Sequence, residues 1–388
     1  MEIVKMGVEE EQTQTQTKTQ TQTQTQRKRL VEYEFLPFDS VYEILTRAPL
    51  DDLHCQCQWV CKDWQKLIYD TNFKLVHSQR TQTISGYFIQ SQVFDEYHTS
   101  IVSIVGNSSY NIPSPSLDFL PKNNSKVVAS SPQGLLCCVN QSDTQVQDFY
   151  ICKPMTRQWI HIPNPKTRYT TERMAMMVKQ SYPTLHYKIL RISSSKAKPW
   201  YPHCEIFDSK NRAWKRSEDI NLPHDVFLDP VKHCILVNGG FHWPTSDGRI
   251  FVYYIDEENW SIIDLPCELR EMNEDESVHN KLVDYEGKIA LLYIINECKL
   301  ELWVLEDHSN HIWEKKFSRN MGSTHRIIGC NNLCGMFSND IVVMKYFDDQ
   351  LILYNWNKDT YSTAKPPGIS SISEVFPFQS DLVPCRFK

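Results

Sequence analysis

Residues 253–266 read "YYIDEENWSIIDLP": an apolar strand, a polar turn, a tryptophan on a second strand, and a proline. Four other stretches follow nearly the same order: "ICKPMTRQWIHIP" (151–163), "CEIFDSKNRAWKRSEDINLP" (204–223), "WVLEDHSNHIWEKKF" (303–317) and "ILYNWNKDTYSTAKPP" (352–367). Their marker aromatics recur about every 50 residues, at Trp159, Trp214, Trp260, Trp313 and Tyr361. This period, with about four short strands in each unit, is typical of β-propeller blades.

The rest of residues 81–388 supports an all-β propeller. Short apolar runs such as "YKILRIS", "KIALLYII" and "DIVVMKYF" predict strands, and Asn238-Gly239 and Asp247-Gly248 predict turns. We expect about six blades, with five or seven as alternatives, and each marker aromatic on an outer strand against a neighbouring blade. An earlier, weaker copy of the repeat is predicted to end at "LDFLP" (117–121), and "DLVPC" (381–385) is predicted to supply the strand that closes the ring.

A small helical segment precedes the strands. In "FLPFDSVYEILTRAPLDDLHCQCQWVCKDWQKLI" (35–68), Ser40 and Glu43 match a capping box for a first helix, which Pro49 is expected to stop. The apolar spacing predicts one helical face from Val41, Ile44, Leu45 and Ala48, a second helix across 50–57, a third across 60–68 and a fourth near 71–78. About 45 residues cannot bury so many large side chains among themselves. This surface therefore faces either another protein or the propeller, and periodicity alone does not decide between them.

Composition excludes several classes of protein. The net charge of −6 and the lack of a basic patch argue against nucleic-acid binding. We expect no signal peptide, and the longest apolar run, Ile289–Ile295, is too short to span a membrane. The thirteen scattered cysteines fit a reducing compartment, so a soluble protein of the cytoplasm and/or nucleus is predicted. Residues 1–33 hold a Gln/Thr-rich tail that is expected to be disordered.

No catalytic, cofactor or metal motif stands out. His203-Cys204 and His233-Cys234 resemble nucleophile pairs, but adjacent residues of a strand point to opposite faces. The acidic run "REMNEDES" (270–277) is interpreted as a solvated loop, and "KPWYPH" (198–203) is either an exposed contact loop or a segment capped by its own blade. We therefore expect a non-catalytic protein with no cofactor and no metal.

The helical segment resembles the F-box, through Leu36-Pro37, Ile44-Leu45, Leu50 with Leu53, and "VCKDW" (60–64) in the order and spacing of that family. The remainder resembles the F-box-associated, kelch-like propeller region common in plant F-box proteins, through "SSPQGLLCC" (130–138), "KPMTRQWIHIP" (153–163) and "SDLVP" (380–384). The resemblance implies a small all-α F-box of about three helices at 34–80 and a propeller at 81–388. Gln56 and Gln58, where the family often has basic residues, and the bulky Trp59 depart from the pattern.

The resemblance also implies a function and its partners. The F-box would dock a SKP-type adaptor, itself bound to cullin and RING subunits, and the propeller would hold an unidentified protein substrate for ubiquitination and degradation. The implied adaptor-binding residues are Leu36, Pro37, Val41, Ile44, Leu45, Leu50, Leu53, Val60 and Trp64. The substrate-binding residues are unknown. The alternatives are an adaptor-binding scaffold outside any ligase, and a propeller that acts as a sugar-binding or enzymatic module.

Overall fold

A computed structural model describes residues 37–387, apart from gaps at 82, 95, 106–115, 122–123, 142–146, 181–183, 196–197, 225, 230–232, 271–277, 297–298, 322–331 and 347–348. The chain divides into two compact units, residues 1–47 and 48–388. Leu36, the Gln/Thr-rich tail and most of the acidic run at 270–277 lie outside the described residues. The domain limits at 33/34 and 80/81 stay predictions. No described helix is long and apolar enough to cross a membrane.

The described residues before the first strand form short helices: α2 (Phe38–Leu45), α3 (Leu50–Cys55), the 3-10 turn η1 (Cys57–Trp59), α4 (Lys62–Tyr69) and α5 (Thr71–Thr81). The predicted fourth helix is confirmed as α5, which runs three residues further than expected. Val60 and Cys61 were predicted inside the third helix but precede α4. Cys61 has an extended backbone (φ −161°, ψ 167°) and stands at the N-cap position, so the helix cannot include it.

The predicted capping box at Ser40 and Glu43 is wrong. The carbonyl of Pro37 accepts hydrogen bonds from the amides of Ser40 and Val41, at 2.9 and 3.1 Å, so Ser40 already lies in the first turn of α2. Glu43 instead pairs with Arg47 one turn further along. Pro49 does not end α2, which stops at Leu45; it is the N-cap residue of α3.

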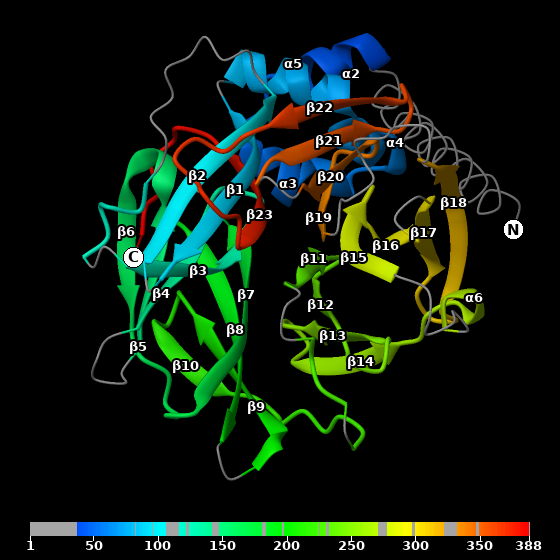
Figure 1. Ribbon diagram of the computed structural model, residues 1–388. Helices are drawn as coiled ribbons and strands as arrows, with labels where there is room; N and C mark the ends of the chain where they lie inside the picture. The colour runs from blue at the N-terminus through cyan, green and yellow to red at the C-terminus, as the bar shows by residue number, and fades with distance from the viewer. Residues whose placement is uncertain are drawn as a thin grey trace, which may run out of the picture. The chain divides into compact units, whose positions relative to one another are not determined.

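From Ile84 onward the described strands form six antiparallel sheets, the blades of a propeller (Figure 1). Blade 1 contains β1 (Ile84–Val93), β2 (Glu96–Val105) and β23 (Glu374–Ser380). Blade 2 contains β3 (Ser125–Ser130), β4 (Leu136–Gln141), β5 (Gln147–Lys153) and β6 (Gln158–Ile162); blade 3 contains β7 (Thr170–Gln180), β8 (His186–Ser195), β9 (Lys198–Asp208) and β10 (Ala213–Arg216). The predicted six blades are thus confirmed.

The other three blades repeat this meander. Blade 4 contains β11 (Ile235–Val237), β12 (Gly240–Pro244), β13 (Ile250–Tyr254) and β14 (Asn259–Ile263), and the short helix α6 (Cys267–Arg270) follows it. Blade 5 contains β15 (Val278–Tyr285), β16 (Lys288–Ile295), β17 (Lys299–Asp307) and β18 (Ile312–Asn320). Blade 6 contains β19 (Asn332–Phe337), β20 (Ile341–Lys345), β21 (Leu351–Asn355) and β22 (Thr360–Ala364).

Neighbouring blades share their apolar cores. The first strand of a blade adjoins the first strand of the next blade, as seen for β3 with β7, β11 with β15, and β15 with β19. In blade 1 the strand β23 takes the place of a first strand, and it adjoins both β19 and β3. Apolar clusters accordingly join side chains from adjacent blades, such as Leu190 of β8 with Phe251 of β13. A strand packed between two blades is covered on both faces, which is why "KIALLYII" is apolar throughout rather than alternating.

Each marker aromatic is the second residue of its blade's outer strand, as the repeat predicted. Two of them make the same bond to the preceding blade. The indole Nε1 of Trp214 donates to the carbonyl of Pro163 at 2.6 Å, and that of Trp313 donates to the carbonyl of Asp264 at 2.9 Å. Both carbonyls directly follow an outer strand, so the tryptophan ties two blades together. Trp159 differs: it packs edge-on against Tyr150 of its own blade and is 40% exposed.

The turn predictions are confirmed in blade 4. Asn238 and Gly239 join β11 to β12 with positive φ angles of 49° and 77°, the geometry that two-residue hairpins require. Gly248 lies between β12 and β13 with φ 81°.

The segment 198–203 is the first half of β9, paired with β8. The interpretation of this segment as an exposed contact loop is therefore wrong.

The ring closes through β23, which pairs with β1 in blade 1. The predicted closing strand at 381–385 is therefore misplaced, because β23 ends at Ser380 and "DLVPC" continues as an irregular segment. "LDFLP" follows β1 and β2 of blade 1 as an irregular segment, and its Leu117 and Leu120 fill the core between blades 1 and 2. A closing strand comes from the far end of the chain, so it falls outside the repeat by which the other blades were recognised.

Three sequence segments meet where the ring closes, and we call this contact the closure latch. The ammonium of Lys153 pairs with the carboxylate of Asp381 and donates to the carbonyl of Val383 at 2.8 Å. Gly134, in the turn between β3 and β4, lies against Ser380. The segments around 130–138, 153–163 and 380–384, quoted above as separate motifs, are therefore one structural feature that joins β23 to blade 2.

Replacing Gly134 with alanine should destabilise the protein much more than replacing Gly248 with alanine. Both glycines have positive φ (74° and 81°), which costs an alanine about 1–2 kcal/mol. At Gly134 the new Cβ would also lie 2.3 Å from the Cβ of Ser380, whereas nothing lies within 4 Å at Gly248. We expect an additional loss of about 1–3 kcal/mol at Gly134 from overpacking. Urea unfolding of the two variants measures the difference, and equal losses would contradict the close packing of the latch.

Candidate partner-docking surface

Helix α2 exposes part of the residue set implied for adaptor binding. Ile44 is 56% exposed and Pro37 is also exposed, but Val41 and Leu45 are only 8% and 1% exposed. Phe38, which was not in the predicted set, is 62% exposed. The outward apolar residues of this helix are thus Phe38 and Ile44, whereas Val41 and Leu45 belong to the core.

The same division holds from α3 to α4. Leu50 and Leu53 are each 2% exposed, so within this chain they are core residues. Val60 and Trp59 are 60% and 58% exposed and lie side by side at the end of η1, and Trp64 is half-buried. Trp59 was noted in the sequence as a departure from the family pattern. Its exposure makes it part of the outward apolar surface.

Helix α4 is attached to blade 5 by a hydrogen bond. The hydroxyl of Tyr69 donates to the Asp284 carboxylate at 2.6 Å, and the amide of Gly287 donates to the other oxygen of that carboxylate at 2.9 Å. Gly287 lies in the turn after β15 and packs against Gln65, whose amide nitrogen would be 2.1 Å from a Cβ at this position. Glycine suits this turn because its φ is 76°, and its missing side chain lets Gln65 lie against the turn.

The ammonium of Lys74 lies in the middle of this contact. It stands 5.3 Å from the centre of the Tyr69 ring and 5.2 Å from that of Phe337 in blade 6, within cation–π range of both. Burial lowers the pKa of Lys74 to about 8, although Asp284, Asp340 and Asp70 are close enough to raise it. Burial also raises the pKa of Asp284 to about 6, despite its hydrogen bonds.

Two further bonds attach the helices elsewhere on the ring. The Thr71 hydroxyl donates to Asp340, in the turn between β19 and β20, and the second Asp340 oxygen accepts the Asn355 amide at 2.8 Å. On α3, Nε2 of His54 lies 3.0 Å from the side-chain oxygen of Gln379 near the end of β23. Burial lowers the pKa of His54 to about 4, so the ring is neutral at pH 7. The helices α3–α5 thus contact blades 1, 5 and 6 where the first strands end.

A second polar cluster lies where the first strands begin. Glu374, the first residue of β23, lies 3.2 Å from the ammonium of Lys126 on β3 and 3.4 Å from His233 just before β11. The His233 ring also packs on Phe376 at 4.6 Å. Blades 1 and 4 stand opposite each other in a six-bladed ring, so this contact crosses its centre. Lys126 and His233 lower the pKa of Glu374 against the effect of burial.

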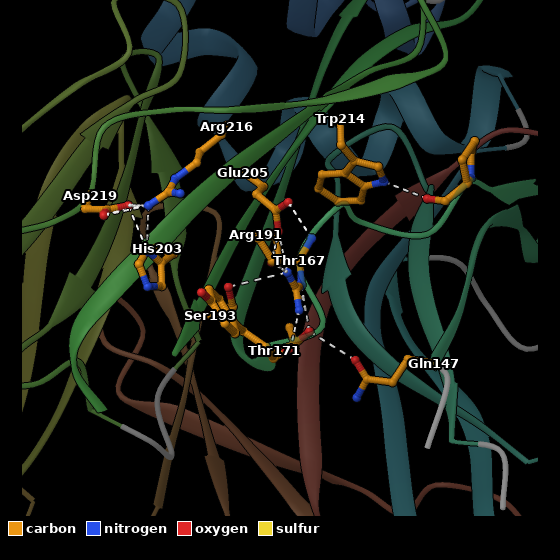
Figure 2. A network of polar contacts seen from close by, with 12 residues as sticks. Gln147, Thr167, Thr171, Arg191, Ser193, His203, Glu205, Trp214, Arg216 and Asp219 are labelled. Carbon is orange, nitrogen blue, oxygen red and sulfur yellow. Dashed lines mark hydrogen bonds and ion pairs between the residues drawn. The ribbon is translucent and has the colours of Figure 1, made fainter. Parts of the chain in front are cut away.

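Figure 2 shows a third cluster, inside blade 3. Arg191 and Glu205 form an ion pair with side chains only 2% and 1% exposed. Glu205 also accepts the amide and hydroxyl of Thr167, at 3.2 and 2.7 Å, and Arg191 donates to the Thr171 hydroxyl at 2.8 Å. Thr167 belongs to the segment between blades 2 and 3. The buried pair therefore holds that segment in place.

The side chains of His203 and Cys204, considered above as a nucleophile pair, lie in different surroundings. Nδ1 of His203 lies 2.8 Å from the Asp219 carboxylate (Figure 2). The His203 ring also stacks on Tyr169, with ring centres 4.7 Å apart. Cys204 is fully buried in the core between blades 3 and 4, and burial raises the pKa of its thiol. The two side chains thus lie on opposite faces of β9, and the neighbouring imidazole cannot activate this thiol.

Comparison with known proteins matches residues 76–374 to the model of the F-box associated beta propeller domain. An Arabidopsis thaliana F-box protein is 23% identical over 367 residues, which cover 90% of this chain and 98% of the relative. Another from the same plant is 31% identical over 170 residues, 42% of this chain and 89% of the relative. A third, described as a putative F-box protein of that plant, is 26% identical over 71% of this chain and 76% of its own length.

Proposed function

Because this chain belongs to the F-box associated beta-propeller family, we propose that it is the substrate-recognition subunit of an SCF-type ubiquitin ligase. In this proposal the helical segment 37–81 binds a SKP-type adaptor, and through it cullin and RING subunits, in the cytoplasm and/or nucleus. The propeller holds a protein substrate for ubiquitination, and the chain itself performs no chemistry.

The exposed apolar residues of the helical segment carry this proposal. Phe38, Ile44, Trp59 and Val60 are each between 56% and 62% exposed, and they lie close together in the sequence. Such side chains on short helices are typical of a surface that a partner covers. The buried Val41 and Leu45 would then act indirectly by holding α2 in shape, and the buried Leu50 and Leu53 by doing the same for α3.

Co-expression with a SKP-type adaptor should raise the yield of soluble, monodisperse protein and give a stable complex. The reason is that adaptor binding removes the exposed apolar surface from water. Yield, size-exclusion chromatography and co-purification measure the effect. Addition of a cullin–RING pair then separates the proposal from its alternative: assembly of a complex that transfers ubiquitin supports a ligase subunit, and an adaptor complex that excludes cullin supports a scaffold. Equal behaviour with and without the adaptor would contradict both.

A further inference from the structure

We propose that Tyr69, Lys74 and Asp284 are positioning residues that lock helices α3–α5 to the propeller in one orientation. This inference rests on the proposed function, because it concerns how the substrate-holding ring is presented to the ligase. We call the contacts of Tyr69, Lys74, Asp284, Phe337 and Asp340 the junction lock.

The junction lock draws on residues from four separate elements. Tyr69 ends α4 and Lys74 belongs to the second turn of α5, whereas Asp284 is near the end of β15 and Phe337 ends β19. The Tyr69 hydroxyl reaches the Asp284 carboxylate, and the Lys74 ammonium lies over the Tyr69 and Phe337 rings, only when both helices lie correctly over blades 5 and 6. A shift of either helix by one turn would move the groups about 5 Å apart.

A second attachment prevents rotation about the first. His54 of α3 contacts Gln379 of blade 1, on the other side of β19 from blade 5. Close packing adds to both, because the glycine at 287 lets Gln65 of α4 approach the backbone of the turn. Three helices attached at separate points of one ring cannot pivot as a group without breaking at least one contact.

The charges of the lock favour one orientation rather than high stability. At both Lys74 and Asp284 burial shifts the pKa toward the neutral form, so the loss of solvation outweighs the attraction between the two groups. Charged groups held in such a site are often no more stabilising than apolar side chains of equal size. A misplaced apolar contact is still apolar, but displaced helices would leave Asp284 without the Tyr69 hydroxyl and Lys74 without its two aromatic rings. The lock therefore penalises every other orientation.

A fixed orientation has a consequence for the ligase. The helices occupy the end of the ring where the first strands finish, at Asp284, Asp340 and Gln379. The end with Glu374, Lys126 and His233 is where the first strands begin. With the adaptor on the exposed Trp59 and Val60 between α3 and α4, the lock points this second end away from the adaptor, and a substrate bound there would be held at a fixed distance from the RING subunit.

The test compares a double variant, Tyr69→Phe with Lys74→Met, with the control variant Asn72→Ala. Asn72 is an exposed residue of α5, the helix that carries Lys74. Noncanonical amino acids carrying spin labels replace the exposed Lys62 on α4 and Lys210 in blade 3, so that the native cysteines need no change. Double electron–electron resonance then reports the distance between helix and ring. We expect one narrow distribution for the wild type and Asn72→Ala, and a broad or shifted distribution for the double variant.

Two further measurements separate positioning from general stability. Amide exchange in residues 67–81 should become about tenfold faster in the double variant, since the Tyr69 hydrogen bond and the Lys74 ring contacts are lost, while exchange in β8, β13 and β17 stays unchanged. Tyr69→Phe alone, which removes one hydroxyl, gives a milder version if the double variant folds poorly. An unchanged distance distribution in a folded variant would overturn the lock. If the wild-type protein did not bind the adaptor, the proposed function would be overturned instead.

Discussion

Replacement of Lys153 by methionine should lower the free energy of unfolding by about 3–5 kcal/mol, the usual loss when one partner of a buried ion pair is removed. The Lys153 and Asp381 side chains are only 5% and 13% exposed. Methionine fills much of the same space but leaves the Asp381 carboxylate without its cation and the carbonyl of Val383 without its donor. Both acceptors lie directly after β23, so the damage falls on ring closure.

Lys215→Met is the matched control. Lys215 pairs with Glu258 at 2.8 Å, but its side chain is 69% exposed, and exposed ion pairs contribute about 0–1 kcal/mol. Urea unfolding of both variants, followed by circular dichroism, gives the two losses. Hydrogen exchange should show the opening first in β1 and β23 of the Lys153 variant. Similar stability of the two variants would mean that the latch does not hold the ring closed.

The parts of the fold that repeat could be predicted from the sequence. The tryptophans at 159, 214, 260 and 313 take the same position on the outer strands of blades 2 to 5, because these blades repeat one packing arrangement about every 50 residues. The closing strand could not be placed this way. It pairs with β1 from the other end of the chain, and no neighbouring copy shows where it begins.

The helical segment was predicted less accurately, for a physical reason. Periodicity identifies the apolar residues of a short helix but does not say which of them the chain itself buries. Ile44 and Leu45 are adjacent and equally apolar, yet one is 56% exposed and the other 1%. The partners of Tyr69 and Lys74 lie more than 200 residues away in the sequence, at Asp284 and Phe337, so only the folded chain brings them together.

This difference between Ile44 and Leu45 gives the most direct test of the adaptor surface. Ile44→Asp should abolish adaptor binding and leave folding intact, because the carboxylate is solvated in the free protein and desolvated only under the adaptor. Burial of an unpaired charge costs several kcal/mol, so we expect the adaptor Kd to rise by more than about 100-fold. Leu45→Asp places the same charge where the side chain is 1% exposed, and should lower the melting temperature even without adaptor.

A thermal melt, circular dichroism and adaptor titration on both variants distinguish the two effects. The expected pattern for Ile44→Asp is an unchanged melt, an unchanged β-rich spectrum and no adaptor binding. Leu45→Asp should show a lower melt in the free protein, with any loss of binding following from partial unfolding of α2. If Ile44→Asp bound the adaptor as well as the wild type, α2 would not form part of the docking surface, and the exposure of Ile44 and Phe38 would need another partner to explain it.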